Sequence, residues 1–374
     1  MTLNYFLKNY IPFFILTICI FPFLGKLYTG DLQPLYFIFL SLYFIISLLY
    51  QRTVPDKAYI LLFFTAIFII ILRLRFGYDL ATNLRGLVTY LTPLLMIYLI
   101  YSSNISEKSY EAILKASMII YFIFGLLEYF NMQQIAFFLL DFRENLGRGV
   151  ASLAPEPSMF GFTYTLIFIS LNFLTKPNIF YWGLFLFGML LCGSLSAILA
   201  SSVIFLSLFQ RPIMVIFYSL LVIILINILP LDAFIPERLL GLIKISSMEI
   251  FLLDESINER AGHLFFIFTE LHHYFFGGSE PWGSAYYKFI AESSIFFYGS
   301  SFNNVLSGIG ALIYDGGLLG IIYLLLILRK SLALKNYSTF FIISWMLIAI
   351  QSVSFAHPML TLPLALQLNN KNGQ

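Results

Sequence analysis

Long apolar runs that recur along the whole chain are the feature that most constrains its fold. A helix that crosses the roughly 30 Å hydrocarbon core of a bilayer needs about 20 apolar residues, and slightly shorter runs suffice where the ends snorkel. The sequence predicts spanning helices near residues 9–24, 34–50, 58–74, 86–102, 112–129, 159–174, 179–193, 195–209, 213–229, 310–328 and 338–354. The stretch His357–Leu368 fits either a short twelfth span or a re-entrant segment.

The composition agrees with a chain that is surrounded by lipid. Of its 374 residues, 60% are hydrophobic and 11% are charged, whereas soluble domains carry about 45–50% apolar and about 25% charged residues. A mean hydropathy of +0.89 leaves too little polar surface for a water-soluble particle of 43.0 kDa. We therefore expect one all-α polytopic membrane domain over residues 1–374, with about 11–12 transmembrane helices.

The distribution of lysine predicts the orientation, because Lys and Arg accumulate in short cytoplasmic loops. Every second connection contains a lysine or, in one case, only Arg211, which places these connections and the N-terminus in the cytoplasm. No small-residue cleavage site follows the first apolar run, so we interpret that run as a retained helix. Two longer connections, 130–158 and 230–309, then fall on the outer face, and we expect amphipathic helices in the second.

Arginine shows a different distribution and gathers on the outer face. The arginines predicted there are Arg73, Arg75, Arg85, Arg143, Arg148, Arg238 and Arg260. A guanidinium group binds phosphate or carboxylate through paired hydrogen bonds, so arginine suits the capture of such groups. Arg73, Arg75 and Arg85 share one short outer loop and would suit the diphosphate of a lipid-linked substrate. Anchoring of the helix ends to lipid phosphates explains them equally well.

Several function classes lack their usual sequence signals. The middles of the predicted spans contain almost no ionisable residues, which argues against a proton-coupled or ion-coupled transporter. The sequence contains no phosphate-binding GxxxxGK(S/T) loop, no HExxH motif and no paired-cysteine metal motif, so we expect neither ATP hydrolysis nor a cofactor. Cys19 and Cys192 lie inside apolar runs and are expected to pack as small hydrophobic residues. A net charge of +2 gives no reason to expect nucleic acid as a partner.

A proline-containing motif marks the start of a mid-chain helix. In Arg148…Glu156-Pro157-Ser158, Pro157 suits the first helical turn because it lacks a backbone donor. The helix dipole then favours an ionised Glu156 carboxylate, which could orient or deprotonate a sugar hydroxyl. A plain N-cap, in which Glu156 and Ser158 accept hydrogen bonds from free amides, is the alternative.

A second set of candidates lies on a predicted helix of the long outer connection. Helical periodicity places Arg260, His263, Ile267, Glu270 and Tyr274 on one face. This face combines a phosphate binder, an imidazole that is the second candidate proton acceptor, a carboxylate and an aromatic ring that could stack on sugar. An interfacial helix with snorkelling charges would show a similar pattern.

The order of these motifs resembles the bacterial O-antigen or capsule repeat-unit polymerases of the Wzy type, which are related to the O-antigen ligases. The resemblance covers roughly residues 60–360. It rests on Arg148…Glu156-Pro157-Ser158, Gly193-Ser194-Leu195-Ser196, Glu259-Arg260, Gly277-Gly278, Ser301-Phe302-Asn303 and Asp315-Gly316-Gly317-Leu318-Leu319-Gly320. The glycines of the last motif are expected to allow close helix packing.

This resemblance implies a GT-C-like enzyme of the bacterial inner membrane, with a cytoplasmic N-terminus and an active site on the periplasmic face. It implies undecaprenyl-diphosphate-linked oligosaccharides as substrates and metal-independent glycosyl transfer, and it allows a chain-length regulator as a partner. Arg260 would bind the leaving diphosphate first, followed by Arg148, Arg85, Arg75 and Arg73. An O-antigen ligase, or a flippase or exporter of lipid-linked sugars, is the alternative. Ser300 stands where ligases usually carry a histidine, which favours the polymerase.

Overall fold

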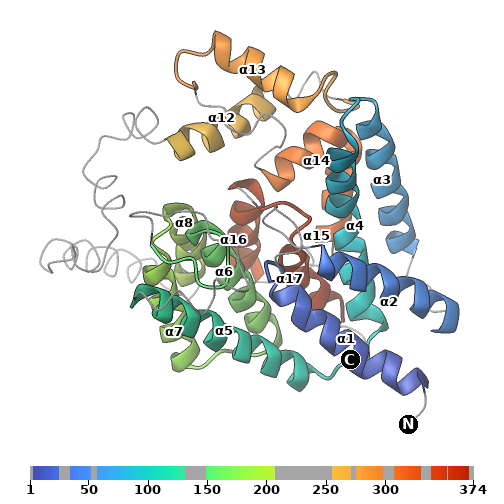
Figure 1. The fold of residues 1–374 in the computed structure, drawn as a ribbon, viewed down its shortest axis with the longest axis vertical. Coiled ribbons are helices and arrows are strands. Elements are labelled where there is room, and N and C mark those ends of the chain that lie inside the picture. Colours follow the sequence, from blue (N-terminus) through green and yellow to red (C-terminus); the bar gives the residue numbers. More distant parts are fainter. Residues whose placement is uncertain are drawn as a thin grey trace, which may run out of the picture.

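The protein is all-helical in the part of the chain that the structure describes. The computed structural model describes residues 3–24, 34–51, 57–130, 149–206, 255–270, 275–297, 307–329, 338–351 and 353–369. These residues form fourteen helices and no strand (Figure 1). The predicted span at 213–229 lies outside the described residues, as do Arg143 and Arg238.

Five helices make up the N-terminal part of the bundle. They are α1 (Leu3–Ile20), α2 (Leu35–Gln51), α3 (Lys57–Leu74), α4 (Leu80–Ser102) and α5 (Glu107–Tyr129). Polar caps fix the starts of the last two, because a side-chain oxygen satisfies an amide that the first turn leaves free. Asp79 accepts a hydrogen bond from the amide of Thr82 (2.8 Å), and Ser106 accepts one from the amide of Ser109 (3.2 Å).

The middle of the chain forms three apolar helices and two helices of the long connection. The apolar helices are α6 (Pro157–Leu174), α7 (Ile179–Cys192) and α8 (Leu195–Leu206). Gly193 ends α7 in the left-handed conformation (φ 59°), which only glycine adopts without strain, and α8 begins two residues later. The other two, α12 (Glu255–Glu270) and α13 (Trp282–Glu292), lie across one end of the bundle in Figure 1. We call this end the loop end.

The C-terminal part contains two helices where the sequence predicted one span. The helices here are α14 (Gly308–Gly316), α15 (Leu318–Leu328), α16 (Ser338–Gln351) and α17 (Pro358–Asn369). The prediction of a continuous helix over 310–328 is wrong, because Gly317 (φ 55°) separates α14 from α15. A Cβ atom at Gly320 would overlap the carbonyl of Leu312, so the two helices touch backbone to backbone. The expectation of close packing at these glycines is confirmed.

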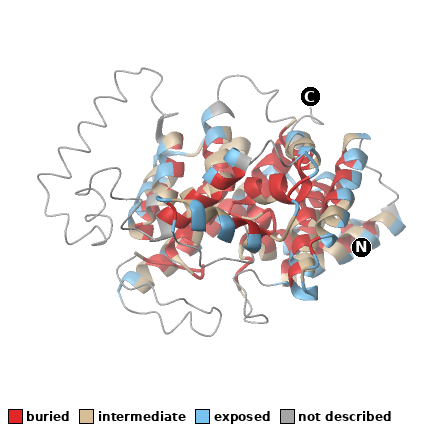
Figure 2. Cartoon of the chain, turned by 90° about the horizontal axis from the view of Figure 1, so that it is seen from above, coloured by how far each residue is buried: buried red, intermediate tan, exposed pale blue. Residues whose placement is uncertain are grey.

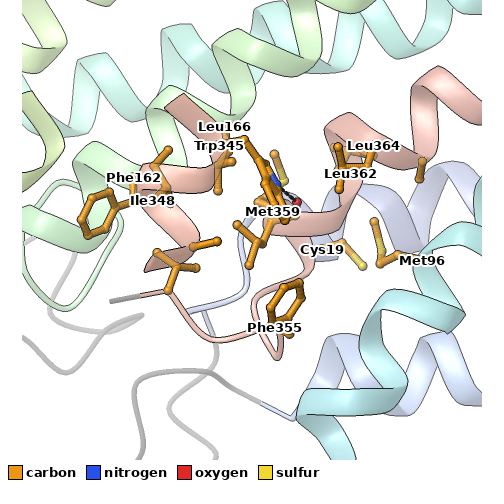
Figure 3. Packing of buried hydrophobic residues seen from close by; sticks show 14 of the residues in the cluster. Cys19, Met96, Phe162, Leu166, Trp345, Ile348, Phe355, Met359, Leu362 and Leu364 are labelled. Atoms are coloured by element: carbon orange, nitrogen blue, oxygen red, sulfur yellow. Dashed lines mark hydrogen bonds between the residues drawn. The ribbon is translucent and has the colours of Figure 1, made fainter. Parts of the chain in front are cut away.

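The last helix is short and is buried among the others. At 1.5 Å per residue, the 12 residues of α17 extend about 18 Å, well short of the roughly 30 Å of hydrocarbon. Residues from Pro358 to Gln367 are all buried, and α17 packs against both α4 and α6. The indole of Trp345 on α16 donates a hydrogen bond to the carbonyl of Leu360 (2.5 Å), within the cluster of apolar side chains in Figure 3. A re-entrant segment, the second alternative for His357–Leu368, fits this arrangement.

The exposed faces of the outer helices are apolar, as lipid requires. Among the described residues, α3, α4, α5 and α6 are long and apolar enough to span a membrane, and α1, α2, α7, α15 and α16 are shorter apolar helices. Buried residues make up 78% of α6 but 28% of α3, so α6 is central and α3 is peripheral. The exposed residues of α3 include Phe64, Phe68 and Ile71, and Figure 2 shows exposed surface on the outer helices. Water-soluble monomers rarely expose apolar surface of this extent. The protein is therefore a helical membrane protein.

Tyrosine hydroxyls connect the helices inside the bundle. Tyr36 donates to the carbonyl of Ala356 (2.7 Å), and Tyr323 donates to the carbonyl of Tyr90 (2.7 Å). Each bond satisfies a hydroxyl that would otherwise be costly to bury, and each joins segments that are far apart in the sequence. Because lipid provides no hydrophobic driving force between helices, these polar contacts help to determine which helices pack together.

We expect Gly320→Ala to destabilise the protein, because the added methyl group must displace the backbone of α14. Overpacking of this kind costs about 1–3 kcal/mol, which would lower the midpoint of thermal unfolding in detergent. Gly183→Ala on α7 is the matched control, since a Cβ at Gly183 meets no atom within 4 Å. Equal melting of the two variants would contradict the close α14–α15 contact.

Candidate functional site

Arg73, at the end of α3, forms a buried ion pair with Asp315 of α14. Its Nη1 donates to Oδ2 of Asp315, and the side chains are 12% and 1% exposed. The hydroxyl of Tyr90 on α4 donates to the same carboxylate oxygen (2.5 Å). Three helices therefore meet at one carboxylate. The charge of Arg73, which we expected at a substrate diphosphate, is compensated within the protein.

Arg75 holds the turn that precedes α13. Its Nη2 donates to the carbonyls of Phe276 (2.8 Å) and Gly278 (2.6 Å). Gly277 has φ 86°, and a Cβ there would press on the carbonyl of Tyr314, so the turn requires glycine at this position. The amide of Gly278 donates to that same carbonyl of Tyr314 (2.7 Å). The Gly277-Gly278 motif thus fixes the long connection to the end of α14, next to Asp315.

Arg85 differs from the other two arginines of its loop because it lies one turn inside α4, and its side chain is exposed like that of Arg75. Asp79, the N-cap of α4, lies close enough for electrostatic interaction with Arg85. Hydrogen bonds from Thr82 lower the pKa of Asp79, and the charge of Arg85 adds to that shift. Of the predicted trio, Arg73 is the one whose side chain is largely buried.

A carboxylate at the end of α5 shapes the approach to α6. Glu128 accepts hydrogen bonds from the amides of Ala151 (2.8 Å) and Ser152 (2.6 Å). Ser152 has φ 55°, a conformation that costs free energy outside glycine and is here held by these bonds. The turn ends at Glu156, the N-cap of α6, whose carboxylate accepts from the Ser158 hydroxyl (2.5 Å). Because Glu156 makes no side-chain capping bond to an amide, the plain N-cap alternative does not describe it.

Arg260 of α12 reaches the break between α7 and α8. Its Nη1 donates to the hydroxyl of Ser196 (3.1 Å), in the first turn of α8. Ser196 and Ser194 are themselves within hydrogen-bond distance (3.0 Å).

The same break lies against the start of α6. Cys192, the last residue of α7, donates from Sγ to the carbonyl of Pro157 (3.0 Å), and Gly161 packs against Ala197 of α8. The structure therefore brings Arg260, the Gly193–Ser196 break and the Glu156-Pro157-Ser158 motif to one region of the loop end.

His263, the second candidate proton acceptor, is enclosed by aromatic rings. Its side chain is fully buried, with ring centroids 4.9 Å from Trp282 and 4.3 Å from Tyr286. Burial lowers the pKa of His263 to about 3, so the imidazole is neutral at physiological pH. Ile267, on the same face, is buried against Gly310 of α14. This face of α12 therefore packs inward, and His263 does not lie where a bulky sugar could reach it.

Three predicted site residues have side chains outside the described part of the chain. These are Arg148, Glu270 and Tyr274. The Ser301-Phe302-Asn303 segment lies outside it as well. Among the residues that the structure does describe, no group of three His, Cys, Asp or Glu side chains is arranged to hold a metal ion.

Two polar residues of the loop end were missed by sequence reasoning. Tyr90 and Glu128 both lie inside apolar helices, where a polar side chain is costly unless it has a partner. That cost was the available signal, since a partly buried carboxylate such as Glu128 needs hydrogen-bond donors from other parts of the chain. The partners themselves come from other elements and have no sequence signature.

A scan against models of protein families finds no match for this chain, and a search of curated proteins finds none either.

We expect Asp315→Asn to be strongly destabilising, because it leaves the charge of Arg73 buried without a counter-ion. Breaking a buried pair in this way costs about 3–5 kcal/mol, which thermal unfolding in detergent would detect. Lys288→Met is the matched control, because it breaks an exposed pair with Glu280 (2.8 Å) that is worth at most about 1 kcal/mol. The double variant Arg73→Met, Asp315→Leu should unfold at a higher temperature than Asp315→Asn. Equal effects of Asp315→Asn and Lys288→Met would refute the buried pair.

The burial of His263 predicts acid-sensitive stability. Its pKa is 6.5 when unperturbed and about 3 in the folded protein, so protonation favours the unfolded state. The contribution of neutral His263 to the free energy of unfolding is complete above pH 6.5 and is lost as the pH falls from there toward 3. Between pH 7 and pH 5 the loss is about 2 kcal/mol. His263→Phe removes this proton linkage. Melting curves at the two pH values should therefore differ less for the variant than for the native chain, and parallel shifts would show that water reaches the imidazole.

Proposed function

We propose that this protein is a membrane glycosyltransferase that joins lipid-linked oligosaccharide repeat units into a polymer. The substrates would be undecaprenyl-diphosphate-linked oligosaccharides, and the product O-antigen or capsular polysaccharide. The observation that carries the proposal is the position of Arg260, held by Ser196 at the break between α7 and α8 and close to the start of α6. A cation beside a carboxylate motif at the end of membrane helices suits a lipid diphosphate and a sugar hydroxyl.

The reaction would be a direct displacement at the anomeric carbon of the growing glycan. A hydroxyl of the incoming repeat unit forms the new C–O bond while the bond to the lipid diphosphate breaks. The electron pair leaves with the diphosphate, and the hydroxyl proton passes to a carboxylate. The anomeric configuration inverts. Because the leaving group is already good, the protein needs to position the reactants and stabilise developing charge, without a metal or nucleotide.

The contacts at the loop end support a division of roles among the predicted residues. Arg260 would stabilise the charge on the departing diphosphate, with Arg148 and Arg85 assisting. Glu156 would accept the proton, since its carboxylate lies at the start of α6 beside the Ser158 hydroxyl, whereas His263 is enclosed. Glu270 and Tyr274 remain proposed sugar contacts.

Arg73 and Arg75 would affect the reaction indirectly, by stabilising the fold of the loop end. They hold the loop end in place by way of Asp315 and the turn before α13. Their contribution to the reaction would then be to position the segment that carries Arg260.

The membrane setting is part of the same proposal. We place the protein in a bacterial inner membrane through 11–12 spans of GT-C-like arrangement, with its N-terminus in the cytoplasm and the loop end in the periplasm. The distribution of lysine supports this orientation. A chain-length regulator would be a further partner.

Surface glycans from a deletion strain, separated on a gel beside the complemented strain, test the proposal. A ladder that collapses to core bearing a single repeat unit supports a polymerase. Loss of every capped form with polymer on the lipid carrier indicates a ligase. Loss of capped forms with single units trapped on the carrier indicates a flippase or exporter. Either of the last two results overturns the proposal.

Complementation with Arg260→Ala tests the residue on which the proposal depends most. Removing one group that stabilises transition-state charge typically slows a reaction about 100-fold to 1,000-fold, so the long-chain part of the ladder should disappear. Lys288→Ala is the control, since Lys288 is an exposed cation on the neighbouring helix α13. An immunoblot of membranes confirms equal protein levels. A native ladder with Arg260→Ala would remove Arg260 from the mechanism.

A further inference from the structure

Two adjacent phenylalanines project from the turn between α12 and α13. Phe275 and Phe276 are 61% and 65% exposed, although each is a large apolar side chain. Their rings contact each other edge to face, with centroids 4.8 Å apart. Water is a poor environment for this pair, because full burial of one such side chain is worth about 1.5–3 kcal/mol.

The backbone beneath these side chains is held firmly. The carbonyl of Phe275 accepts a hydrogen bond from the amide of Leu318 (3.0 Å), the first residue of α15. The carbonyl of Phe276 accepts one from Arg75 (2.8 Å). Both carbonyls therefore bind the bundle, and the exposure of the two rings is a property of the fold.

Arg75 and Leu318, which bind the carbonyls of the two phenylalanines, lie at the edge of the exposed apolar surface. Arg75 directly follows α3, whose exposed side chains Phe68, Ile71 and Leu74 are 54–55% exposed along the peripheral face of a membrane span. Leu318, which binds Phe275, begins a second apolar helix and is itself 43% exposed. The phenylalanine pair thus continues an apolar surface that lipid already covers.

The start of α4, which follows the turn after Arg75, has the chemistry of a membrane interface. Leu80 and Leu84, in the first turns of α4, are 76% and 52% exposed, and the exposed guanidinium of Arg85 follows Leu84 directly. Apolar side chains interspersed with cations at the end of a span match the boundary between acyl chains and phosphate headgroups. A water-facing surface, or one shaped for neutral sugar alone, would not combine them.

We infer that Phe275 and Phe276 insert into the headgroup–acyl boundary of the bilayer beside α3. The inserted pair anchors α12 and α13 flat on the membrane surface, so Arg260 is held at the depth of lipid phosphates. This inference does not depend on glycosyl transfer, because a ligase, a flippase or a protein of another activity would be anchored in the same way. The occupant is lipid, and a second copy of the chain is the competing occupant that the experiment distinguishes.

Nitroxide labels on single cysteines, in the full chain reconstituted into vesicles of phosphatidylethanolamine and phosphatidylglycerol, test this inference. The label replaces Phe276 (Phe276→Cys) and, in a second protein, Phe275 (Phe275→Cys). Phe68→Cys on α3 is the lipid-facing reference, and Lys288→Cys on α13 is the water-facing reference. Native Cys19 and Cys192 are buried, so the folded protein does not label there. The measurement is power saturation with oxygen, which concentrates in lipid, and with a neutral nickel chelate, which stays in water.

We expect the ratio of oxygen to nickel accessibility at positions 275 and 276 to approach that of Phe68→Cys. It should exceed the ratio at Lys288→Cys by about tenfold or more, because a polar chelate is strongly excluded from apolar surroundings. A ratio like that of Lys288→Cys would place the pair in water and overturn the inference. Low accessibility to both reagents, with an immobilised spectrum, would indicate a second copy of the chain and would overturn it as well.

Discussion

The ion pair between Arg73 and Asp315 is the interaction on which the loop end depends. It lies where α3, α4 and α14 meet, and Tyr90 binds the same carboxylate. Two opposite charges removed from water stabilise a structure only when their geometry and their remaining hydrogen bonds are satisfied. The pair therefore fixes one arrangement of three helices more than it adds net stability. The carbonyl of Tyr314, next to Asp315, then accepts a hydrogen bond from the amide of Gly278 and lies in close contact with Gly277.

The contact between Tyr314 and the Gly277-Gly278 turn connects the fold of the bundle to the proposed chemistry. The segment that contains α12 and α13 is bound at two separate places, by Arg75 at the end of α3 and by Arg260 at the start of α8. A side chain that stabilises developing charge is effective only when it is already in position, because reorganisation during the reaction would cost the free energy that it supplies. Binding at two places, with an aromatic cluster around His263 between them, holds Arg260 in position in this sense.

The sequence predicted the helices better than the contacts of the arginines, for a physical reason. Apolar runs predict the ends of α3 to α6 and the starts of α3 and α6 to within two residues. The helices α4 and α5 begin earlier than predicted, at the polar caps Asp79 and Ser106, because an apolar run does not include the polar first turn. The function of Arg73 depends on a partner 242 residues away, which no local pattern reveals. The break at Gly317 was missed because the apolar residues on both sides of Asp315-Gly316-Gly317 were interpreted as one span, although an acid followed by two glycines also fits a turn. Helical periodicity places His263 and Arg260 on one face, but His263 is fully buried whereas Arg260 is partly exposed.

The buried histidine shows what kind of structure the long connection forms. An imidazole with a pKa near 3 requires a dry environment, and Trp282, Tyr286 and Phe266 provide one outside the apolar spans. The helices α12 and α13 thus have an aromatic core of their own, which a flexible loop would lack. A small core of this kind leaves the outer faces of both helices free to carry other surfaces. One face contacts α14 and α8, while Phe275 and Phe276 project at the edge of the lipid. If it is held at the membrane surface, as we infer, this compact layer would suit the proposed reaction between two lipid-linked molecules, because both reacting groups would arrive at the same depth.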